Sequence, residues 1–127
     1  MIPQEELNRI SGSIVDSAFK VHSSMGPGLL ENVYQKCMAH ELGKHGLRFQ
    51  EQITLPLQYD GVRLDSGLRL DLLVEDLVVV ELKAIESILP VHQAQLLSYM
   101  KLARKPLGLL INFNVPLIKD GIQRMAR

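Results

Sequence analysis

The sequence predicts an α/β fold, a three-layer α/β/α sandwich with a mixed central sheet. Three observations lead to this expectation. Apolar residues recur at helical spacing up to residue 44, they alternate with polar residues from residue 48, and a β–α–β pattern follows from residue 77. A chain of 127 residues suits one compact domain, so we expect residues 1–127 to form a single domain.

Two helices are expected first. Residues 4–24 follow Pro3 and begin with acidic residues, which favour a helix N-terminus. Their apolar side chains repeat every three or four residues: Leu7, Ile10, Ile14, Ala18 and Val21. The sequence MGPG at 25–28 ends this helix, because glycine and proline interrupt helices. A second helix is expected at 29–44, where GKHG stops it.

Strands follow the second helix. Residues 48–64 alternate apolar and polar side chains around the turn signal Asp60-Gly61, which is typical of a strand and hairpin. Residues 67–84 continue as two more strands joined near Glu75 and Asp76. The run LVVVEL within them is apolar nearly throughout, which predicts a central strand buried on both faces.

A β–α–β unit completes the predicted sheet. Pro90 begins a helix that Pro106 ends, and LGLLINFNV at 107–115 has the length and composition of another buried strand. Because a helix connects it to the LVVVEL strand, the two strands should be parallel, with a right-handed crossover. A short polar tail should complete the chain.

The bulk composition excludes some functions. Fourteen basic and 14 acidic residues give a formal net charge of zero, which counts against a protein that coats DNA by non-specific attraction but not against an enzyme. The sequence has no apolar run of 18 residues, and MIPQEELNR at its start is polar and acidic. We therefore expect no membrane span, no secretory signal and a cytoplasmic location.

The charged residues within the apolar strands include Asp71, Glu81 and Lys83. A buried carboxylate is costly without a partner, so these residues need an explanation. Glu81 and Lys83 are two apart and share one strand face, and Asp71 on the preceding strand is close enough to meet Glu81. Two converging carboxylates favour a hard divalent cation, Mg²⁺ or Mn²⁺. The lysine could orient a water molecule or stabilise charge on a phosphate.

The loop between these two strands decides whether the carboxylates converge. A two-residue turn at Glu75-Asp76 would send Glu81 to the side of the sheet opposite Asp71. An odd-length loop, such as residues 75–77, or a bulge would bring them together. We predict such an irregularity.

The same residues carry a family resemblance. Asp71, nine further residues and then Glu81-Leu82-Lys83 resemble the D…(D/E)xK signature of the PD-(D/E)XK nuclease superfamily. In the helix that follows, Gln95 is one turn before the tyrosine of QLLSY, which resembles the QxxxY motif of the RecB-type branch.

The N-terminal half extends this resemblance. Gly28, Glu31 and Tyr34 match the pattern GxxExxY. Together with LRLDLLVED, VVVELKA, QLLSY and GLLINFNVPLIKDGIQR in the same order, they make the chain similar to the GxxExxY protein family over nearly its whole length.

The resemblance implies a restriction-endonuclease-like fold with an αβββαβ core. It also implies Mg²⁺- or Mn²⁺-dependent hydrolysis of phosphodiester bonds in nucleic acid, with DNA as the expected substrate. Asp71, Glu81 and Glu31 would be metal ligands, and Lys83 the catalytic lysine. The residues that would bind substrate or support the site are Gln95, Tyr99 and Tyr34.

Simpler interpretations stay open for several of these residues. Glu31 would favour the dipole at a helix N-terminus without any site. Tyr34 also fits the core, and Glu81 with Lys83 could form only a structural ion pair. The alternative function is a non-catalytic module that binds nucleic acid or protein on a nuclease fold. Small nucleases that cut duplexes often need two active sites, so a homodimer is an expected assembly.

Overall fold

A five-stranded mixed sheet forms the centre of the computed structural model, which describes residues 2–127 apart from the side chain of Ser66. The strands lie in the order β1-β2-β3-β4-β5. β3 and β4 are parallel, as predicted, and the other neighbouring pairs are antiparallel. The strands are β1 (Phe49–Tyr59), β2 (Val62–Val74), β3 (Val78–Lys83), β4 (Leu107–Asn112) and β5 (Ile122–Ala126).

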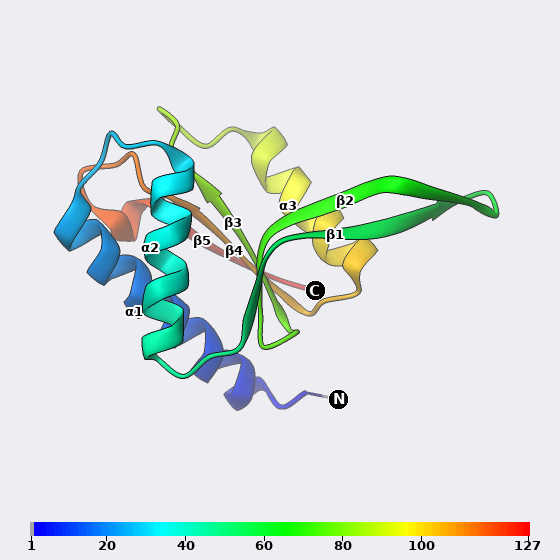
Figure 1. Ribbon diagram of the computed structural model, residues 1–127, viewed down its shortest axis with the longest axis horizontal. Coiled ribbons are helices and arrows are strands. Elements are labelled where there is room, and N and C mark those ends of the chain that lie inside the picture. Colours follow the sequence, from blue (N-terminus) through cyan, green and yellow to red (C-terminus); the bar gives the residue numbers. More distant parts are fainter. Residues whose placement is uncertain (1) are drawn as a thin grey trace.

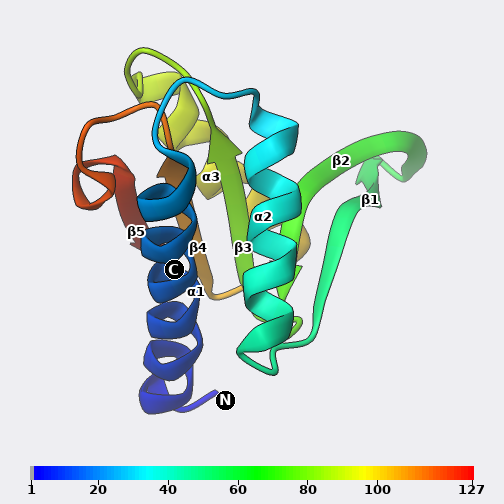
Figure 2. The ribbon, with the colours of Figure 1, turned by 60° about the vertical axis from the view of Figure 1, so that its left-hand side comes forward.

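Helices cover both faces of the sheet (Figure 1, Figure 2). α1 (Gln4–Met25) and α2 (Glu31–Lys44) lie side by side on one face, and α3 (Pro90–Ala103) lies on the other. A short 3-10 helix, η1 (Ile118–Gly121), precedes β5. Within residues 2–127, no helix has the length and apolar character needed to cross a membrane. The predicted α/β/α sandwich with a mixed sheet is confirmed.

Each face of the sheet has its own apolar core, and β3 contributes to both. Val78, Val80 and Leu82 pack in the first core, under α1 and α2, whereas Val79 packs in the second core, under α3. This burial on two sides explains why the β3 sequence is apolar nearly throughout. Because strand residues alternate, Glu81 and Lys83 lie on the α3 side with Val79.

Two sequence expectations were wrong. Residues 62–74 form one continuous strand, because a register shift opposite Leu55–Leu57 absorbs the polar segment 65–67 that had suggested a break. The polar tail contains β5, which pairs with β4. Ile122 packs against the first core and Met125 against the second. Two apolar residues alone do not form a pattern of alternating apolar and polar residues that would predict a strand.

The β1–β2 hairpin bends away from the rest of the sheet (Figure 1). On β2, Leu72 belongs to the first core and Leu70 to the second, although residues two apart on a regular strand share a face. The pairing between the strands stays in register through this point, with Glu51 opposite Leu72 and Ile53 opposite Leu70. The change of face therefore comes from a local twist, and Asp71 lies in it.

Candidate active site

The loop between β2 and β3 has three residues, as the convergence of Asp71 and Glu81 requires. Val74 pairs with Val78, and Leu72 pairs with Val80. One further step along each strand brings Asp71 opposite Glu81. The prediction of an odd-length loop is confirmed.

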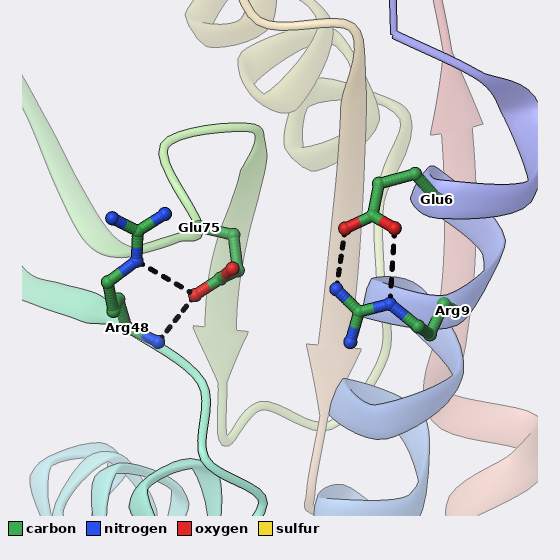
Figure 3. A network of polar contacts seen from close by, with 4 residues as sticks. All are labelled: Glu6, Arg9, Arg48 and Glu75. Carbon is green, nitrogen blue, oxygen red and sulfur yellow. Dashed lines mark hydrogen bonds and ion pairs between the residues drawn. The ribbon is translucent and has the colours of Figure 1, made fainter.

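Glu75 fixes this loop to the chain that enters β1 (Figure 3). Its carboxylate Oε2 accepts a 2.6 Å hydrogen bond from the Arg48 backbone N–H, and its own N–H donates to the Arg48 carbonyl at 2.8 Å. Arg48 Nε is 3.5 Å from the same carboxylate oxygen. Glu75 and Asp76 adopt left-handed φ angles of 53° and 55°. These contacts stabilise the loop and hence the register that brings the two carboxylates together.

Asp71 and Glu81 meet where regular pairing of β2 with β3 ends. Beyond Leu72 and Val80, side chains take the place of ladder hydrogen bonds. The Leu82 N–H donates to Asp71 Oδ2 at 2.9 Å, and the Asp71 N–H donates to Glu81 Oε1 at 3.4 Å. Each carboxylate is therefore held by the backbone of the other strand.

Glu81 is the more deeply buried of the two acids, with a relative exposure of 4%. Burial, and then the neighbouring charge of Asp71, raise the pKa of Glu81 to about 9, and Lys83 opposes this shift. Without a cation, Glu81 thus holds its proton at neutral pH. A divalent cation between the carboxylates would offset the repulsion that favours the proton.

Lys83 points to α3, where Gln95 contacts it and Tyr99 contacts Gln95. Its Nζ donates to Gln95 Oε1 at 3.3 Å, and Gln95 Nε2 donates to the Tyr99 hydroxyl at 2.8 Å. The two motif residues thus form a chain that ends on the lysine. This contact orients the Lys83 ammonium group beside the acidic pair.

Glu31 is the first residue of α2, and its side chain is only partly covered by its neighbours. Burial and then the charge of Asp71 raise the pKa of Glu31, and Lys83 lowers it. Glu31 therefore lies within electrostatic reach of Asp71 and Lys83, although it shares no hydrogen bond with either of them. Its position at the N-terminus of α2 equally fits the dipole interpretation, so its role as a ligand stays a prediction.

Tyr34 is a core residue that supports the turn before α2. It is fully buried, and its ring stacks on Phe113 with centroids 4.4 Å apart. Its hydroxyl donates to the Gly26 carbonyl at 2.6 Å and accepts from the Leu29 N–H at 3.1 Å. This burial leaves no surface for a substrate, so Tyr34 can act on the site only by fixing the start of α2.

Sequence reasoning missed two polar residues around the site. Gln52 on β1 donates to Asp71 Oδ1 at 3.3 Å, and it has a left-handed φ of 47°, for which the sequence gives no signal. Asn112 is buried at the end of β4 and bonds both the N–H and the carbonyl of Ile85, just after Lys83. An asparagine within the apolar run LLINF was a visible signal for the second of these.

The donors at the site suit a hard divalent cation. Asp71 and Glu81 offer carboxylate oxygens, and Mg²⁺ commonly binds through one or two carboxylates together with water and substrate phosphates. In the described part of the chain, no three His, Cys, Asp or Glu residues come close enough to hold a metal ion. Two carboxylates suit a Mg²⁺ or Mn²⁺ ion whose other ligands are water and substrate phosphates.

Comparison with known proteins identifies the family of the chain. A family model described as the PD-(D/E)XK nuclease superfamily matches residues 8–125. The chain belongs to the PD-(D/E)XK nuclease superfamily. Neither the curated proteins nor the solved structures contain a significant match to it. Membership in the PD-(D/E)XK superfamily supports nuclease activity and a nucleic-acid substrate, and these nucleases typically use divalent metals.

Proposed function

We propose that this protein is a Mg²⁺- or Mn²⁺-dependent nuclease that hydrolyses phosphodiester bonds, with DNA as its substrate. The observation that carries the proposal is the convergence of Asp71 and Glu81 beside Lys83, where two strands separate. A structural ion pair needs one acid and one base. Such a pair does not explain why a second carboxylate lies beside the first. Burial and repulsion make the charged form of Glu81 unfavourable enough to keep it protonated.

Each residue has a proposed role. Asp71 and Glu81 would hold the cation, and Glu31 on α2 would complete the set. When bound, the cation would supply Lewis-acid stabilisation of charge on the phosphate. Lys83, oriented by Gln95 and Tyr99, positions the attacking water or neutralises charge that develops on the phosphate.

Further features of the proposal follow from the sequence motifs. We propose that the chain lies with the GxxExxY family, through Gly28, Glu31 and Tyr34, and with the RecB-type branch, through Gln95 and Tyr99. We also propose that residues 1–127 work as one domain, that the protein is cytoplasmic and that it forms a homodimer on duplex substrates.

Cleavage by purified protein tests the proposal. Single-stranded and duplex DNA and RNA are incubated with Mg²⁺, Mn²⁺ or EDTA, and products are resolved on denaturing gels. We expect metal-dependent cleavage that Lys83→Ala abolishes. Lys119→Ala is the matched control, because it removes an exposed lysine on η1. Wild-type protein that cuts no substrate, or cleavage unchanged in Lys83→Ala, contradicts the proposal.

A non-catalytic module is the second candidate. The balance of 14 basic and 14 acidic residues favours it, because it provides little general attraction to phosphates. Calorimetric titration separates the two functions. A module without catalysis has no need of a cation, so the absence of Mg²⁺ or Mn²⁺ binding at millimolar concentration would favour it.

A further inference from the structure

We propose that Gln52 is a positioning residue that orients the Asp71 carboxylate and that Gln35 of α2 holds Gln52 in place. This inference rests on the proposed function, because it concerns the side chain assigned to the metal. Gln52 and Gln35 lie outside the D…(D/E)xK, QxxxY and GxxExxY motifs.

The backbone at Gln52 has an unusual conformation. Its φ of 47° is left-handed, in the middle of β1, where extended angles are the rule. A residue with a side chain is strained there, and such strain persists only when the surroundings hold it. The same position lies in the twist where the β1–β2 pair changes face, between the pairs Glu51–Leu72 and Ile53–Leu70.

The amide of Gln52 joins two elements to Asp71. Its Nε2 donates to Asp71 Oδ1 at 3.3 Å and also to Gln35 Oε1. An amide nitrogen has two hydrogens, so both bonds can exist together. Gln35 Nε2 in turn lies 3.4 Å from Glu51 Oε1. The result is a chain of side-chain contacts from β1 through α2 to the carboxylate.

These contacts fix both oxygens of Asp71. Oδ1 accepts from Gln52 on one neighbouring strand, and Oδ2 accepts from the Leu82 N–H on the other. Two donors on opposite sides define the plane of a carboxylate, and outer contacts of this kind orient metal ligands. Loss of the Gln52 amide should therefore let the Asp71 carboxylate rotate.

The chain also ties α2 to the site. Gln35 is one helical turn after Glu31, so the two side chains share a face of α2. The Gln35–Gln52 contact therefore ties the N-terminal turns of α2 to β1, and the Gln52–Asp71 bond extends this connection to β2. Because Glu31 and Gln35 share this face, the Gln35–Gln52 contact also sets how α2 presents Glu31 to the acidic pair.

Gln52→Gly tests the proposal because it separates loss of the side-chain amide from strain in the backbone. Glycine removes the amide but accepts a left-handed φ, so the fold should not lose stability at this position. We expect Mn²⁺ affinity, measured by electron paramagnetic resonance, to fall by about tenfold or more. Gln58→Gly is the matched control, because it removes an exposed glutamine from the same strand. Its Mn²⁺ affinity should equal that of wild type.

A second variant tests the chain of contacts. Gln35→Ala should weaken Mn²⁺ binding less than Gln52→Gly, and the double variant should bind no worse than Gln52→Gly, because the two residues act in series. Additive losses of Mn²⁺ affinity in the double variant would show that the two residues act independently, and would overturn the proposal that Gln35 acts through Gln52.

A metal-free measurement separates this inference from the proposed function. Hydrogen exchange of the Leu82 amide reports the bond to Asp71, and it should be faster in Gln52→Gly than in Gln58→Gly. If wild type binds no Mn²⁺, the metal site fails while the Leu82 exchange still decides the positioning role. Unchanged Leu82 exchange, or Mn²⁺ affinity equal to wild type in folded Gln52→Gly, overturns that role.

Discussion

The backbone N–H of Leu82 donates a 2.9 Å hydrogen bond to the carboxylate of Asp71, at the point where β2 leaves β3. The Asp71 side chain there replaces the next backbone–backbone hydrogen bond between the two strands. This exchange explains how an apolar sheet accommodates a carboxylate and orients it toward Glu81.

The first prediction concerns pH. The folded-state pKa of Glu81, about 9, lies above the ordinary value of 4.5, so folded protein binds more protons than unfolded protein between these values. Stability of the metal-free protein should therefore fall as pH rises through this window. The raised pKa values of His45 and Glu31 act in the same direction.

Glu81→Gln isolates the contribution of Glu81, because it keeps the shape and removes the titration. In EDTA at pH 8 it should raise the free energy of unfolding by at least the ~1.4 kcal/mol that one pKa unit represents. The gain should be smaller at pH 5. Urea unfolding at both pH values measures it, and a variant that is less stable than wild type at pH 8 would contradict this account.

The second prediction concerns the β2–β3 loop. Glu75→Ala removes the acceptor of the Arg48 backbone N–H and should lower the free energy of unfolding by ~1–2 kcal/mol. Arg48→Ala should cost less than ~0.5 kcal/mol, because that side chain is 87% exposed and its ion pair is screened. Equal losses in the two variants would mean that the ion pair, and not the backbone contact, fixes the loop.

The third prediction concerns Lys83. Gln95→Ala frees the ammonium group from its acceptor and should reduce the cleavage rate by about tenfold in single-turnover assays, which corresponds to ~1.4 kcal/mol. Tyr99→Phe should have a smaller effect, because Gln95 keeps its contact with Lys83. Ser98→Ala, an exposed change on α3, is the control. A full rate in Gln95→Ala would remove the QxxxY pair from the site.

The fourth prediction separates Tyr34 from the chemistry. Tyr34→Phe retains the stacking on Phe113 but loses both bonds to the turn before α2. Thermal unfolding should reveal a loss of ~1–2 kcal/mol, whereas Mn²⁺ affinity should stay within about twofold of wild type. A large loss of metal affinity in a stable Tyr34→Phe protein would instead give Tyr34 a direct role.

Much of this arrangement could be predicted from the sequence, because strand parity is a strict rule. Asp71 and Glu81 are ten residues apart, which is an even number. Two such residues can pair across a hairpin only if the loop has an odd number of residues, and the loop of residues 75–77 has three. The β3–α3–β4 unit could also be predicted from the sequence, since its central strands are apolar on both faces. Membership in the PD-(D/E)XK superfamily, expected from the resemblance of Asp71 and Glu81-Leu82-Lys83 to its signature, is confirmed by the family match.

Other parts depend on tertiary context that local sequence does not record. The twist at Gln52 comes from packing β1 and β2 against two different cores, and nothing in FQEQITL signals a left-handed residue. β5 forms by pairing with the free edge of β4, and the β5 sequence has only a weak pattern of alternating apolar and polar residues. Glu31 shows the limit for side chains, since the motif selects the residue but does not determine how closely it approaches the pair.

The most direct test of the central claim is the anomalous difference density of crystals soaked in Mn²⁺. We expect a peak in contact with carboxylate oxygens of both Asp71 and Glu81, and the loss of that peak in Asp71→Asn crystals. A well-diffracting soaked crystal with no peak there, or with its peak held by other residues, would contradict it.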